Sequence, residues 1–260
     1  MDCIDLRLRS GRRRLRALTG EDQRALHGGA GAARGLLARL CVDDDGPGAT
    51  DIGSLSAADR DRLLAALWQH EFGDTILATH RCGDCRELFD LSFSLAGLVE
   101  SLEAMPRPED VDGMTPDGHA RLKTGQTVRP PTAVDEAAVA AMPVATAADA
   151  LARRCVSGGA LPAPDVLDRV LDWLDPVVDV DLVGVCPECG ARQAVRFSIE
   201  HYLMTALRLE QRRLMREIHL LAATYGWSLG EVLSLDRQER QVLTAHVEAD
   251  RHAARAGAWP

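Results

Sequence analysis

The sequence predicts an α+β protein made of a tandem duplicated unit, joined by a shared four-cysteine zinc site and followed by a helical C-terminal tail. Three observations support this fold class. First, two Cys-x-x-Cys motifs, at 82–85 and 186–189, lie far apart in the chain. Second, each motif comes at the end of the same series of sequence blocks. Third, helical periodicity dominates after the second motif. The predicted organisation is a first repeat unit at 1–99, a linker at 100–119, a second repeat unit at 120–198 and a helical extension at 199–260.

Five sequence blocks recur in the same order in the two halves. The blocks of the first half are 8–11, 19–22, 37–42, 61–64 and 82–94. Their counterparts are 122–125, 132–135, 151–156, 168–171 and 186–198. Single matches arise easily by chance in helices rich in alanine and arginine, but five ordered matches do not. The pattern therefore indicates an internal duplication.

Each unit is predicted to begin with a β-hairpin and two helices. In the first unit, strands at 4–8 and 15–18 flank a Ser-Gly turn. Thr19 or a neighbouring residue is expected to cap a helix that runs toward Cys41. A loop rich in Asp, Gly and Pro at 43–53 then leads to a second helix, which starts at the Ser-x-x-Asp pattern of 56–59.

A strand, a cysteine knuckle and a second strand are predicted to close the unit, with strands at 75–79 and 88–95 around the first Cys-x-x-Cys motif. The segment 100–119 separates the two units. It contains several prolines, glycines and acidic residues. That composition is typical of a linker or a long surface loop.

The two cysteine motifs predict one structural zinc ion per chain. A Cys-x-x-Cys loop can place two thiolates on one metal ion, and two loops complete a tetrahedral site. The predicted ligands are Cys82, Cys85, Cys186 and Cys189. Two alternatives remain open: two separate thiol pairs, or a thioredoxin-like redox site. The redox site requires a motif that leads into a helix, whereas strand-like residues follow both motifs.

Charge and composition narrow the functional classes. The net charge of −9 has the wrong sign for a nucleic-acid-binding protein. No signature of a catalytic site is present, and no apolar run approaches the roughly 20 residues that span a bilayer. The N-terminus does not have the pattern of a signal peptide. We therefore expect a cytoplasmic protein without enzymatic activity, whose paired cysteines serve metal binding or redox chemistry rather than structural disulfides.

A cluster of arginines in the first hairpin is a candidate binding surface. The candidate partner-binding residues there are Arg9, Arg12, Arg13 and Arg14, with Arg7 and Arg16 beside them. One interpretation is a solvated face that pairs with the protein's own acidic residues. The other is a docking site for an acidic protein partner or for phosphate.

The tail is predicted to form a long helix, a short helix and another long helix. Gly226 is placed to end the first helix, and the patterns at 228–231 and 236–239 resemble capping boxes. Trp227 lies at the corner and is a further candidate partner-binding residue. The apolar stripe of the first helix would pack on the protein's own core or dock a partner. The tail has as many arginines as acidic residues, which disfavours a DNA-binding helix-turn-helix.

Several segments resemble a known family. The segments 217–222, 225–228 and 231–233 look like the tail motif of small proteins encoded with contractile phage tails and related injection systems. The segments 16–22, 59–61 and 72–74 are similar to phage baseplate hub assembly proteins. The chain departs from that family by its second, diverged copy and its helical extension. The resemblance implies a non-enzymatic baseplate component or assembly factor that engages hub, spike or tape-measure-like proteins.

Two other classes predict different properties. A zinc-ribbon regulator that binds nucleic acid would have a basic surface on the knuckles, but few positive charges surround Cys186. A metal- or thiol-dependent enzyme would have an open coordination position or a reactive cysteine with a depressed pKa.

Overall fold

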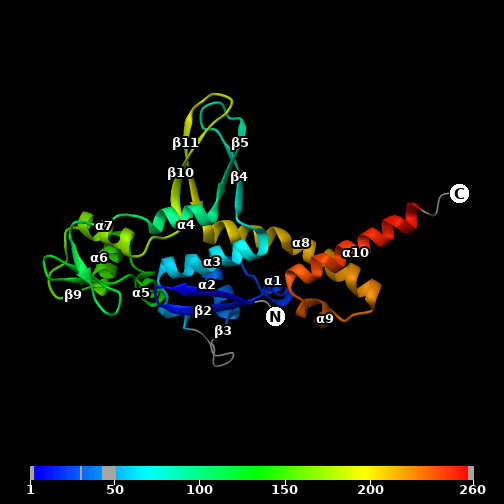
Figure 1. The fold of residues 1–260 in the computed structure, drawn as a ribbon, viewed down its shortest axis with the longest axis horizontal. Coiled ribbons are helices and arrows are strands. Elements are labelled where there is room, and N and C mark those ends of the chain that lie inside the picture. Colours follow the sequence, from blue (N-terminus) through cyan, green and yellow to red (C-terminus); the bar gives the residue numbers. More distant parts are fainter. Residues whose placement is uncertain (1–2, 30, 43–50, 257–260) are drawn as a thin grey trace.

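The computed structural model describes residues 3–29, 31–42 and 51–256. The chain forms a mixed α/β structure with several small antiparallel sheets and a helical C-terminal region (Figure 1). Two compact units lie side by side, and a pair of long hairpins projects from the first unit (Figure 1). The C-terminal helices lie on the side of the first unit that is opposite the second unit (Figure 1).

The first unit contains a three-stranded sheet with helices packed against it. Its strands, in order across the sheet, are β1 (Cys3–Leu8), β2 (Gly11–Arg16) and β3 (Cys41–Val42). Its helices are α1 (Gly20–Arg24), α2 (Ala32–Leu40), the 3-10 turn η1 (Ile52–Ser54), α3 (Ala57–Phe72) and α4 (Leu95–Glu103). Leu15, Leu37, Leu63 and Leu67 are fully buried in the core between them.

The helix that was expected to run toward Cys41 is broken into α1 and α2, so that prediction was wrong. Three glycines lie between the two helices, and two of them adopt positive φ: 119° at Gly29 and 87° at Gly31. Glycine reaches this conformation without steric strain, but it interrupts a helix. The loop predicted at 43–53 lies mostly outside the described residues. Ser56 caps α3 as predicted, accepting a hydrogen bond from the backbone N–H of Asp59.

The second unit has a four-stranded sheet and three helices. Its strands, in order, are β6 (Val111–Met114), β7 (Ala120–Leu122), β8 (Thr127–Val128) and β9 (Val156–Ser157). Its helices are α5 (Ala133–Val139), α6 (Val144–Cys155) and α7 (Pro164–Leu174). The segment 100–119, predicted as a linker, contains the end of α4 and all of β6. Burial explains the difference, because Val111 is only 2% exposed and packs with Leu122 and Val170.

A buried aspartate with two arginine partners occurs at the start of the first helix in both units. Thr19 and Asp22 form a capping box, and Asp22 Oδ2 and Oδ1 accept from Arg16 at 2.6 Å and Arg39 at 2.9 Å. In the second unit, Thr132 and Asp135 form the same box, and Arg129 and Arg154 bind Asp135 at 2.6 and 2.8 Å. These contacts join the hairpin and both following helices.

The Asp22 cluster makes stability depend on pH. Burial opposes ionisation, but hydrogen bonds from Arg16 and Thr19 outweigh it and lower the pKa of Asp22 to about 2. The stabilisation is therefore complete above the unfolded pKa of about 4 and is lost as the pH falls toward about 2. We expect Asp22→Asn to reduce the free energy of unfolding by about 2 kcal/mol at pH 7. Urea unfolding at pH 7 and pH 3 would measure this; an equal loss at both pH values would contradict it.

The tail consists of α8 (Ile199–Tyr225), α9 (Leu229–Ser234) and α10 (Arg237–Ala256). Its predicted boundaries are confirmed: Gly226 ends α8 with a φ of 71°, and Ser228 and Glu231 form a capping box. The apolar stripe of α8 packs on the protein's own residues. Leu203 and Leu207 enter the core of the first unit, and Leu221 packs against α9 and α10.

Two buried arginines of α10 fix the tail to the first unit. Arg240 is fully buried and donates to Glu217 Oε2 at 3.3 Å, to the Leu235 carbonyl at 2.6 Å and to the Gln23 side chain. Arg237 binds Glu210 at 2.7 Å and donates to a backbone carbonyl of α3. The tail is therefore an integral part of the fold.

Candidate metal centre

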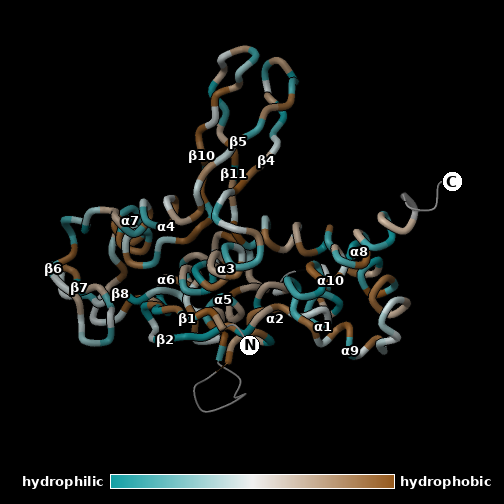
Figure 2. The backbone as a smooth tube through the Cα atoms, turned by 45° about the vertical axis from the view of Figure 1, so that its right-hand side comes forward, coloured by the Kyte–Doolittle hydropathy of each residue, from teal (hydrophilic) through white to brown (hydrophobic). Residues whose placement is uncertain are grey.

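The four cysteines lie at the tips of two long hairpins. The first hairpin consists of β4 (Thr75–Arg81) and β5 (Leu88–Ser94), and the second of β10 (Asp179–Val185) and β11 (Arg192–Ser198). Each is antiparallel over seven residue pairs. Together they project from the body as one feature, here called the stalk (Figures 1 and 2). Each hairpin was predicted as strand, knuckle, strand.

The two cysteine loops have the same backbone geometry. In the first, the Cys82 N–H donates to the Glu87 carbonyl at 2.9 Å, and the Arg86 N–H donates to the Cys82 carbonyl at 3.1 Å. Cys186 makes both types of bond in the second loop, each at 2.9 Å. The residue after the second cysteine has positive φ in both loops, 68° at Arg86 and 73° at Gly190. The turn therefore directs both thiols of each motif to the same side.

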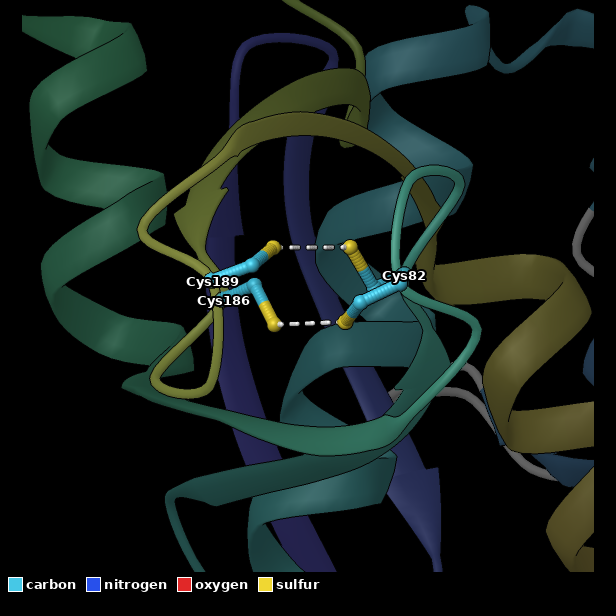
Figure 3. Close-up of side chains that lie close together, drawn as sticks. Cys82, Cys186 and Cys189 are labelled. Atoms are coloured by element: carbon cyan, nitrogen blue, oxygen red, sulfur yellow. Dashed lines mark hydrogen bonds between the residues drawn. The ribbon is translucent and has the colours of Figure 1, made fainter.

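The four sulfur atoms form a compact cluster between the hairpins. All lie within 4.8 Å of one another. The Sγ atoms of Cys82 and Cys189 are 3.7 Å apart, as are those of Cys85 and Cys186, and they face each other across the gap (Figure 3). A disulfide would need about 2.05 Å. Tetrahedral zinc with bonds of about 2.3 Å separates its sulfurs by about 3.8 Å. The cluster thus fits a metal ion.

The thiols differ in their tendency to ionise. The backbone N–H of Cys85 favours the Cys82 thiolate and lowers the pKa of Cys82 to about 7. The Glu87 N–H acts in the same direction on Cys85, but burial and the neighbouring thiols outweigh it and raise the pKa of Cys85 to about 12. Like charges so close together disfavour one another, so a cation that compensates them would favour the thiolate form. Binding of a divalent metal ion would release the remaining protons.

Apolar contacts are few at the tip of the stalk, whereas Phe93 and Phe197 pack edge to face at its base. Phe89 and Val195 are its buried apolar side chains near the tip, with the cysteines beside them. Gly184 lets the hairpins approach closely, since a Cβ there would lie 3.1 Å from the Phe89 ring. The Gly83 N–H donates to Gln193 Oε1 at 3.0 Å, which ties one knuckle to the other hairpin. A bound ion would add to the stability of so small a core.

The other candidate residues lie away from this cluster. The arginines Arg9, Arg12, Arg13 and Arg14 are all on the β1–β2 hairpin, but not on one face. Arg14 pairs with Asp5 at 3.0 Å, whereas Arg13 is half-buried and its Nε has no partner among the described residues. Trp227 stacks on Tyr225 at 4.8 Å and packs in the small core of the tail.

Comparisons with known proteins identify no relative: no family model, curated protein or solved structure matches this chain. Within the described residues, none of the helices combines the length and the apolar character that crossing a membrane requires. The chemistry of the four-cysteine cluster and the surfaces of the fold are therefore the basis for inferring function.

Proposed function

We propose that this protein is a non-enzymatic scaffold or assembly factor stabilised by one structural zinc ion. The observation that carries the proposal is the set of four thiols from two hairpins, with sulfur spacings that suit tetrahedral zinc. Four protein ligands leave no coordination position for water or substrate. The metal would then hold the hairpins together, and the functional contacts would lie elsewhere on the surface.

We further propose that the two units arose by tandem duplication. Both contain a hairpin that pairs with a short third strand, two helices after an Asp-centred capping box, a further helix and a cysteine hairpin. The paired arginines of Asp22 and Asp135 support this origin, because the same side chains join the same elements in each unit. Each copy would supply half of the metal ligands.

The proposed setting is the baseplate or hub of a phage-tail-like contractile injection system. The support is the sequence resemblance of segments 16–22 and 217–228, together with a fold that offers a projecting stalk, an arginine-rich hairpin and a helical tail for protein contacts. Such a protein would act in the cytoplasm during assembly and bind hub, spike or tape-measure-like partners, with or without remaining in the finished particle.

Deletion of the gene in its host tests this setting. We expect contractile particles to be absent, or to lack baseplates, in electron micrographs of the deletion strain. Wild-type protein should restore them, and Cys186→Ser should not. Normal particles in the deletion strain, or a host without contractile particles, would overturn the assignment to injection systems. Neither outcome would affect the zinc site, which metal analysis of the purified protein tests separately.

A further inference from the structure

The sheets of the two units differ by one strand. The first sheet has the order β1-β2-β3, so β1 is an edge strand among the described residues. In the second sheet, β7 takes the place of β1, and β6 covers it in the order β6-β7-β8-β9. The matching sequences at 8–11 and 122–125, where each hairpin turns, align the two strands. No strand of the described residues therefore pairs with β1 at the position that β6 occupies beside β7.

The contacts of β6 show what this position binds. Asp110, directly before β6, pairs with Arg169 of α7 at 3.0 Å. Val111 points into the core, and Asp112 pairs with Arg121 of β7 at 3.1 Å. The added strand therefore presents an acidic, an apolar and an acidic residue in succession.

The first unit has residues equivalent to Arg169 and Arg121, but no strand equivalent to β6 among its described residues. Arg62 of α3 corresponds to Arg169, and Arg7 of β1 corresponds to Arg121. Arg62 Nε binds Glu103 at 2.6 Å, but its Nη1 is buried and has no hydrogen-bond partner within the described part of the chain. Arg7 is exposed, and no acidic side chain of the described residues pairs with it. An unsatisfied buried donor is unfavourable, so a ligand or an ordered water that supplies an acceptor would stabilise it.

A groove of about 250 Å³ runs beside β1 at this place. Its lining comes from β1, α3 and α4 and includes Leu6, Arg7, Arg62, Ala66 and Val99. Alternate residues of an edge strand direct their N–H and C=O groups away from the sheet, which makes it a template for strand addition.

We propose that this groove binds an extended segment of another protein, with an acidic–apolar–acidic pattern, as a strand added to β1. The first acid would satisfy Arg62, the apolar side chain would enter the groove, and the second acid would pair with Arg7. The inference deepens the proposed function, because it names the kind of segment by which a partner protein would dock. The template is β6 of the same chain.

A peptide with the sequence of residues 108–115, labelled with a fluorophore, is the probe. We expect saturable binding to the full-length protein in a fluorescence anisotropy titration, and about tenfold weaker binding after Arg62→Ala or Arg7→Ala. Arg121→Ala is the matched control, since the second unit already holds its own strand, and it should leave the affinity unchanged. A peptide with both aspartates replaced by asparagine should also bind at least tenfold more weakly.

Equal affinity of the wild-type, Arg62→Ala and Arg7→Ala proteins would overturn the proposal, provided that circular dichroism shows all three folded. Sedimentation velocity tests a second copy of the chain as the occupant. Self-association that Ala66→Glu abolishes would assign the groove to a homodimer and would also overturn it. The zinc content of each variant is measured in parallel, so failure of peptide binding and failure of the zinc site remain separate results.

Discussion

Replacing Cys186 by serine should abolish stoichiometric zinc binding and unfold the tip of the stalk. Purified wild-type protein is expected to hold one zinc ion per chain, because all four sulfurs lie within 4.8 Å of one another. A structural zinc site of this kind contributes about 10–16 kcal/mol of apparent binding free energy in small domains. Loss of one thiolate should therefore lower the melting temperature and expose the stalk amides to rapid hydrogen exchange.

Cys3→Ser is the matched control, because Cys3 is an exposed thiol on β1, outside the cluster. It should change neither the metal content nor the exchange of the stalk. Metal content by mass spectrometry and hydrogen exchange would be measured for the wild-type, Cys186→Ser and Cys3→Ser proteins. Unchanged zinc content and unchanged stalk protection in Cys186→Ser would refute the assigned ligand set.

Replacing Arg240 by methionine should cost about 3–5 kcal/mol of the free energy of unfolding. Arg240 is fully buried, and its removal leaves Glu217 as a buried carboxylate without its main partner. The Gln23 side chain and the Leu235 carbonyl also lose their donor. Urea denaturation measures the change. The tail should detach first, seen as earlier loss of protection in α10 than in α3.

Arg216→Met provides the comparison for this change. Arg216 pairs with Glu248 at 2.8 Å between the same two helices, but its side chain is 71% exposed. A solvated pair of this kind contributes at most about 1 kcal/mol. The double variant Arg240→Met, Glu217→Gln should recover part of the lost stability, because it leaves no buried charge unpaired. If Arg240→Met and Arg216→Met lowered the free energy of unfolding by similar amounts, burial of the Arg240 ion pair would not be the cause of its larger contribution.

Local signals predicted much of this fold and most of the candidate site. The cysteine spacing predicted which four cysteines cluster. Cap residues such as Ser56, Ser228 and Gly226 predicted helix boundaries, because each acts through neighbouring backbone atoms. Features that depend on distant contacts were not predicted. β6 is a strand because Val111 is buried against β7 and α7, although its surroundings are rich in proline and glycine.

Buried charged residues were also not predicted from the sequence. Arg237 and Arg240 are buried whereas Arg251 of the same helix is exposed, and only contacts with distant segments distinguish them. Arg62 could have been found, since the blocks 61–64 and 168–171 already align it with Arg169. The alignment could not predict that Arg62 lacks an acidic partner equivalent to Asp110, because Asp110 lies outside the recurring blocks.

The distance along the chain between the two halves of the metal site affects the order of events during synthesis. Cys82 and Cys189 are 107 positions apart, and the whole second unit lies between them. At about 5–20 residues per second, the first cysteine pair would leave the ribosome about 5–20 seconds before the second. During that interval its thiols are open to oxidation or to a foreign ion. Correct metalation of the nascent chain would therefore require a reducing environment, and the ion would be locked in only when translation is nearly complete.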